Sequence, residues 1–82
     1  MALNVPIRPE PLSSQVARQI ENLITSGVWP VGSRIPAEKD LVSQLLVSRN
    51  TVREALRSLA HTGMIEARVG DGTYVRALTE LA

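Results

Sequence analysis

Cysteine is missing from this chain, and aromatic residues are almost missing. Of its 82 residues none is Cys or Phe, and Trp29 and Tyr74 are the only aromatic side chains. Without thiols the chain forms neither disulfides nor thiolate metal sites. Two rings are also too few for a protein that binds single-stranded nucleic acid by stacking bases on several aromatics. The core must therefore be built from Leu, Ile, Val and Ala, which suits small helices.

Long apolar runs and clusters of reactive side chains are missing as well. No segment approaches the roughly 20 apolar residues of a membrane span, and the proline-rich start is not typical of a signal peptide. We therefore expect a cytoplasmic protein with no membrane partner. His61 is the only histidine, and no ligand cluster surrounds it, so we expect no metal site. Ser13 and Ser14 have no base partner in the sequence, and we expect no catalytic residue and no enzyme.

The apolar content is ordinary, whereas the charge is local. Apolar residues make up 44% of the chain, enough for one small folded domain. The net charge of +1 says little about a nucleic-acid partner. Its distribution says more, because Arg49, Arg53 and Arg57 lie within nine residues and are opposed there only by Glu54.

Proline and glycine divide the chain into an arm, a domain and a short tail. Residues 1–10 are rich in proline, which favours an extended N-terminal arm. The domain covers 11–76 and starts with a helix that Ser13 or Ser14 can cap and that Gly27 ends. One face of this helix is apolar: Val16, Ile20, Leu23 and Ile24. Residues 77–82 are expected to begin a linker helix.

Two more helices and a hairpin complete the expected domain. Pro36 opens the second helix, with Glu38 and Asp40 in the first turn, where the helix dipole favours carboxylates. Its apolar positions are Leu41, Val42 and Leu45. Ser48 is the expected N-cap of a third helix, which ends near Gly63. The third helix has the strongest apolar period in the chain: Val52, Ala55, Leu56, Leu59 and Ala60.

After Gly63 the pattern changes from helical to extended. Segments 65–68 and 73–76 are β-prone and are joined by 69–72, whose Asp-Gly pair favours a hairpin. The sequence therefore predicts a mainly α fold with a small β-hairpin, which is a winged helix-turn-helix.

The polar side of the third helix, residues 48–62, is suited to double-stranded DNA. Arg49 and Arg53 are expected to be base readers or close phosphate contacts, because the arginine fork can bond both acceptors of guanine. Asn50 can pair with adenine in the same way. Phosphate contacts are expected from Ser48 and Thr51 at the helix N-terminus and from Lys39 on the second helix. Arg57, one turn deeper, is expected to contact the DNA backbone or to stay in solvent.

The polar side of this helix also has other interpretations. Arginines at four-residue spacing are often only a solvated helix face, and Arg53 and Arg57 could pair with Glu54 or Glu66. A winged helix can also serve as a protein–protein interaction module, which would need an exposed apolar patch in place of the arginines. The arginines argue against that alternative.

Four segments resemble the GntR family of bacterial transcriptional regulators. They are residues 27–38 (GVWPVGSRIPAE), 47–56 (VSRNTVREAL), 63–65 (GMI) and 70–75 (GDGTYV). The likeness extends over roughly 11–76 with the family's spacing, and the VREAL run is most similar to the FadR-like branch.

The resemblance implies a function and an assembly. Family members are homodimers that regulate transcription, mostly as repressors, by reading a pseudo-palindromic DNA operator. The resemblance places Lys39 where the family has a DNA-contacting arginine, and it places Gly70 at a wing tip that approaches the minor groove. It also matches five residues to the family's recognition-helix contacts: Ser48, Arg49, Asn50, Thr51 and Arg53. It also implies a larger C-terminal domain, not contained in this sequence, that binds a small-molecule effector of unknown identity. No cofactor is expected in the domain itself.

Two positions depart from the family pattern. Leu46 stands where the family usually has glycine in the turn between the two helices, so a left-handed backbone there would be strained. Asp71 flanks the wing tip and would be repelled by phosphate unless it bonds within its own turn. Arg68 is then the nearest cation that could substitute at the wing.

Overall fold

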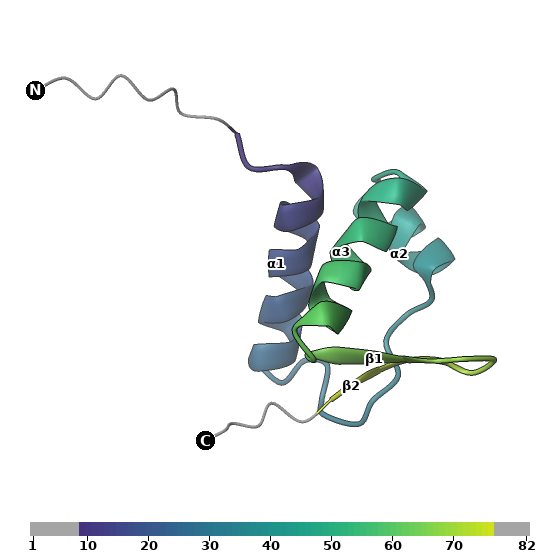
Figure 1. Ribbon diagram of the computed structural model, residues 1–82. Helices are drawn as coiled ribbons and strands as arrows, with labels where there is room; N and C mark the ends of the chain where they lie inside the picture. The colour runs from purple at the N-terminus through teal and green to yellow at the C-terminus, as the bar shows by residue number, and fades with distance from the viewer. Residues whose placement is uncertain (1–8, 77–82) are drawn as a thin grey trace, which may run out of the picture.

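The computed structural model describes residues 9–76, in which three helices are followed by a two-stranded hairpin (Figure 1). The elements are α1 (Leu12–Thr25), α2 (Glu38–Leu45), α3 (Arg49–His61), β1 (Ile65–Arg68) and β2 (Gly72–Val75). The helices pack together, and the hairpin projects from one end of the bundle as the wing (Figure 1). The predicted winged helix-turn-helix is confirmed. The expected linker helix at 77–82 and most of the arm lie outside the described residues.

The start of α1 differs from the prediction. No side chain caps this helix, so the expectation that Ser13 or Ser14 would do so is wrong. The cap residue is Pro11, whose carbonyl oxygen accepts the N–H groups of Ser14 at 3.0 Å and Gln15 at 3.1 Å. Proline lacks an N–H and has a fixed φ, so it is tolerated at the start of a helix. The helix therefore begins directly after Pro11, and both serines lie inside its first turn and not at the cap position. The expected end is confirmed, since Gly27 has a φ of +85° just after the helix.

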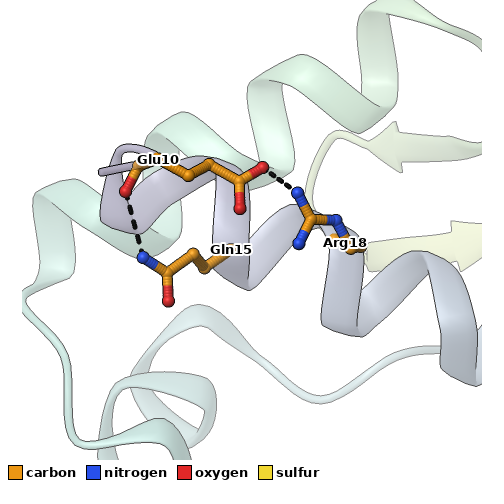
Figure 2. Close-up of polar contacts among 3 residues, drawn as sticks. All are labelled: Glu10, Gln15 and Arg18. Atoms are coloured by element: carbon orange, nitrogen blue, oxygen red, sulfur yellow. Dashed lines mark hydrogen bonds and ion pairs between the residues drawn. The ribbon is translucent and has the colours of Figure 1, made fainter. Parts of the chain in front are cut away.

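Glu10 ties the last residues of the arm to α1 (Figure 2). The Gln15 side-chain amide donates to the Glu10 carbonyl oxygen at 3.0 Å, and the Arg18 guanidinium pairs with the Glu10 carboxylate. These contacts are exposed, so they add little to stability. They connect the described end of the arm to the first two turns of α1.

The core is aliphatic, as the composition requires. All three helices and both strands contribute its buried residues: Val16, Ile20, Ile24, Ile35, Leu41, Val52, Ala55, Leu59, Ile65 and Val75. Ala60 is an exception to the predicted apolar face, because it is exposed. Ala60 lines a groove of about 320 Å³ between α3 and the hairpin. Ala67 and Thr73 of the hairpin line the same groove but do not cover Ala60.

The turn between α2 and α3 contains a left-handed residue. Helix α2 begins at Glu38, two residues after the predicted start at Pro36, because Ala37 is extended and acts as the cap residue. The helix ends at Leu45, and the cap residue Leu46 that follows has a φ of 56° and a ψ of 45° and is 87% exposed. Leucine therefore occupies the left-handed conformation for which its family position usually has glycine.

We expect Leu46→Gly to stabilise the domain by about 0.5–1 kcal/mol. A left-handed backbone costs a non-glycine residue about 1–2 kcal/mol, and part of this gain is lost to the greater entropy of glycine in the unfolded chain. The exposed leucine side chain contributes little burial. Urea unfolding measures the change, and Leu46→Ala is the control because alanine keeps the strained backbone. Equal stability of the two variants would contradict the role of φ.

The hairpin is extended by a third segment of chain. Strands β1 and β2 are antiparallel, with Ile65 opposite Val75 and Arg68 opposite Gly72, so β2 runs one residue earlier than predicted. On its other edge, Gly32 N–H donates to Val75 O at 2.8 Å and Ile35 N–H donates to Thr73 O at 2.9 Å. The loop after α1 therefore pairs with the outer edge of β2 and supports the wing.

Candidate nucleic-acid interface

The start of α3 is capped as predicted. The Ser48 hydroxyl oxygen accepts the Thr51 N–H at 3.1 Å and lies 2.9 Å from the Thr51 hydroxyl. The first N–H groups of a helix have no partner within it and favour an anion. Two oriented hydroxyls and these N–H groups thus lie together at one helix end, which is the arrangement expected for a phosphate contact.

The two sides of α3 are clearly different. Val52, Ala55 and Leu59 are buried against the other elements. The side chains of Arg49 and Arg53 are 63% and 50% exposed, and Arg57 is exposed too. The guanidinium groups are therefore accessible from outside the domain, as a partner that reads them requires.

Arg49 and Arg53 share one carboxylate, which the sequence did not reveal. Glu38, the first residue of α2, has one oxygen 3.8 Å from Arg49 Nε and the other 3.5 Å from Arg53 Nε. From the sequence, Glu38 was only a favourable charge at the start of a helix. No linear spacing indicates this cluster, because it depends on how α2 crosses α3.

Three further predicted site residues are exposed on α2 and α3. Lys39 follows Glu38 on α2 and is exposed. Asn50 lines a groove with Leu12 at the start of α1. Arg57 and His61 line a second groove, of about 440 Å³, whose opposite wall includes Ser13 and Ser14 of α1. The polar side of α3 is therefore continuous with the N-terminal end of α1.

The wing carries Gly70 at its tip, well separated in sequence from the α3 residues. Gly70 has a φ of +75°, a conformation that side chains disfavour. The neighbouring Val69 is fully exposed. The turn thus presents backbone and one small apolar side chain.

Asp71 bonds within its turn, which meets the condition set by the sequence for an acidic residue beside the wing tip. Its carboxylate accepts a hydrogen bond from the Tyr74 hydroxyl at 2.9 Å, and its carbonyl oxygen accepts one from Arg34. The Arg34 side chain crosses Gly72, where a Cβ would lie only 2.3 Å from Arg34 Nε. Arg68 stacks on the Tyr74 ring at 4.0 Å. Arg34 therefore holds the backbone of Asp71, while Arg68 lies on the ring of Tyr74 and pairs with Glu66 at 3.7 Å.

The hydrogen bond to Asp71 raises the pKa of Tyr74 above its usual value of about 10. Desolvation and the negative charge of Asp71 act in the same direction, and Arg34 and Arg68 oppose them without cancelling the shift. Because folding favours the protonated phenol, this stabilisation is complete below pH 10 and is lost as pH rises through the raised pKa. We expect absorbance titration of this single tyrosine to show the raised pKa, and Asp71→Asn to lower it. An identical titration curve in the two proteins would contradict the bond.

Residues 9–76 contain neither a membrane-spanning helix nor a cluster of metal ligands. No helix there has the length and apolarity needed to cross a membrane. The same residues contain no group of three or more His, Cys, Asp or Glu side chains placed to hold a metal ion.

Comparison with known proteins identifies relatives of the whole described domain. The family model "Bacterial regulatory proteins, gntR family" matches residues 12–75. The histidine utilization repressor of Pseudomonas aeruginosa is 45% identical over 67 residues, which are 82% of this chain and 27% of that protein. The chain thus spans about a quarter of the length of such curated relatives.

Solved structures agree in both fold and sequence. The AraR DNA-binding domain in complex with operator ORX1 has a TM-score of 0.79 and 32% identity, covering 90% of this chain and 92% of that one. A Streptococcus agalactiae GntR structure has a TM-score of 0.71 and 42% identity, covering 79% of this chain and 32% of the other. The family match extends from the first helix to the last strand. The chain is a winged helix domain that belongs to the GntR family of bacterial regulatory proteins.

Proposed function

We propose that this chain is the operator-binding domain of a transcriptional repressor and that α3 enters the major groove of double-stranded DNA. The observation that carries this proposal is the pair of accessible guanidinium groups, Arg49 and Arg53, on the first half of a helix whose other side is buried. A helix of this kind fits the major groove, and an arginine fork matches the acceptors O6 and N7 of guanine.

The other residues divide into base and backbone contacts. Asn50 is placed next to Arg49 and can read adenine. Ser48 and Thr51 contact phosphate at the N-terminus of α3, and Lys39 and Arg57 do so from either side of it. The similar AraR DNA-binding domain was solved in complex with an operator, which supports DNA binding by a domain of this fold.

The wing contributes Gly70 and, beside it, the cations of Arg34 and Arg68. Without a side chain at Gly70, the wing backbone can approach the minor groove closely. Asp71 is engaged by Tyr74 and Arg34, which reduces its repulsion of phosphate. Arg68 replaces the basic residue that the wing tip lacks.

The proposed partners are those that the resemblance to the GntR family implies. The domain acts as part of a homodimer, in which two copies of α3 read the halves of a pseudo-palindromic site and bind more tightly than one. A further domain binds a small-molecule effector and controls binding to the operator.

The VREAL run supports placement in the FadR-like branch. A regulator of this kind acts in the bacterial cytoplasm.

A protein–protein interaction module is less well supported. Such a module needs a continuous exposed apolar patch. The large exposed apolar side chains of residues 9–76 are dispersed over the start of α1, the following loop, the turn after α2 and the wing: Leu12, Val28, Val31, Leu46 and Val69. None of them lies on α3.

Selection from a random pool of duplexes tests the proposal. We expect the chain to enrich a recurring half-site, and its affinity to fall steeply with salt because bound phosphates release counterions. A duplex of the same composition in shuffled order is the control. Equal affinity for the two duplexes would contradict sequence-specific binding.

A further inference from the structure

We propose that Glu38 is a positioning residue for operator selectivity, holding Arg49 and Arg53 in the direction in which they meet base edges. The inference rests on the proposed function. It assigns to an acidic residue, which repels DNA, a favourable role in choosing among DNA sequences.

The geometry of the cluster is specific. Each carboxylate oxygen of Glu38 faces a different arginine, at 3.8 Å for Arg49 and 3.5 Å for Arg53. Both contacts are made by the inner nitrogen Nε of the arginine. The outer pair of nitrogens at the end of each guanidinium is therefore left to form the two parallel hydrogen bonds that guanine accepts.

Ordering the arginines before DNA arrives favours binding to the correct site. An arginine side chain carries about 2 kcal/mol of rotamer entropy, part of which is lost when it is held against a base. A carboxylate that already restricts two such side chains reduces this loss on binding. The two arginines are one helical turn apart, so a single carboxylate between them also sets their relative orientation.

The same charge has the opposite effect on binding to any DNA backbone. Glu38 is only 32% exposed and lies beside the residues proposed to face the operator, so its charge acts on nearby phosphates. Removing the charge should strengthen binding to DNA that is held only through its phosphates. It should weaken binding to an operator whose bases are read by correctly oriented arginines. A residue that merely stabilised the fold would not change the two in opposite directions.

The test compares Glu38→Gln with Asp40→Asn in the 82-residue chain. Both substitutions remove one carboxylate from the first turn of α2, but Asp40 is exposed and forms no ion pair within residues 9–76. The probes are the duplex most enriched by the wild-type chain and its shuffled counterpart, at one salt concentration. Thermal unfolding of each variant controls for loss of fold.

Glu38→Gln should lower affinity for the enriched duplex about tenfold, since one well-placed guanine contact is lost. It should raise affinity for the shuffled duplex about twofold, because less negative charge opposes the phosphates. Asp40→Asn should raise both affinities together and leave their ratio unchanged. Glu38→Asp, which keeps the charge on a shorter side chain, should retain part of the selectivity.

A further variant separates this role from a direct contact of Glu38 with DNA. In a chain that carries Arg49→Ala and Arg53→Ala, Glu38→Gln should cause no further loss of selectivity, because there is nothing left to position. A full additional loss there, an unchanged ratio in Glu38→Gln, or an equal loss in Asp40→Asn would overturn the inference. A wild-type chain that prefers neither duplex would instead overturn the proposed function, and this inference with it.

Discussion

Arg49→Ala and Arg53→Ala should each lower operator affinity about 5- to 150-fold at fixed salt, which corresponds to about 1–3 kcal/mol for a lost guanine contact. Both side chains extend from the exposed side of α3 with their outer nitrogens accessible, whereas the buried side holds the helix in place. A mobility-shift series with the enriched duplex measures the loss. It should be much smaller for the shuffled duplex, since only the phosphate attraction is lost there.

Arg18→Ala is the matched control because it removes the same charge from α1, where Glu10 already engages the guanidinium (Figure 2). It should change affinity for both duplexes slightly and equally. The effects of Arg49→Ala and Arg53→Ala should not be additive, since the two arginines share Glu38. If all three single variants bound alike, α3 would not be the helix that reads DNA.

Ile20→Ala should destabilise the domain by about 2–5 kcal/mol, the usual cost of removing three buried carbons and leaving a cavity. Ile20 is 1% exposed and lies at the centre of the face that α1 presents to the core. A domain of this size has a total stability near the lower end of about 5–15 kcal/mol, so the variant should be largely unfolded at moderate temperature. DNA binding should be lost with the fold.

Leu46→Ala is the control for burial because it also removes three carbons, but from a side chain that is 87% exposed. Its free energy of unfolding should change by no more than about 0.5 kcal/mol. Urea unfolding followed by circular dichroism measures both variants. Similar midpoints for the two would contradict the assignment of Ile20 to the core.

Local rules explain where the sequence prediction of the fold was right. The N-cap at Ser48 and the left-handed Gly27 depend on a few neighbouring residues, and both are confirmed. The predicted apolar face of α3 is correct except at Ala60, which the hairpin does not cover. The cap of α1 was assigned wrongly because two serines compete with a proline that already starts the helix at Leu12.

Some features of the candidate site could likewise be predicted from local sequence, and others could not. The exposed side of α3 could be predicted from the spacing of its apolar residues, because helical geometry alone separates the arginines from the buried residues. For Asp71 the sequence set only a condition, a bond within its own turn, and the Tyr74 hydroxyl meets it. The contact of Arg34 with the Asp71 carbonyl oxygen could not be predicted, because Arg34 lies 37 residues away along the chain.

By itself, the sequence determined the order of helices and hairpin, the aliphatic core and the concentration of arginine on one side of the third helix. These properties follow from the spacing of residues along one element, which is set by backbone geometry. Only the tertiary structure decided that Glu38 meets both Arg49 and Arg53, and that Arg34 holds the wing turn. Such contacts depend on how separate elements cross, and that crossing is decided by the packing of the shared core.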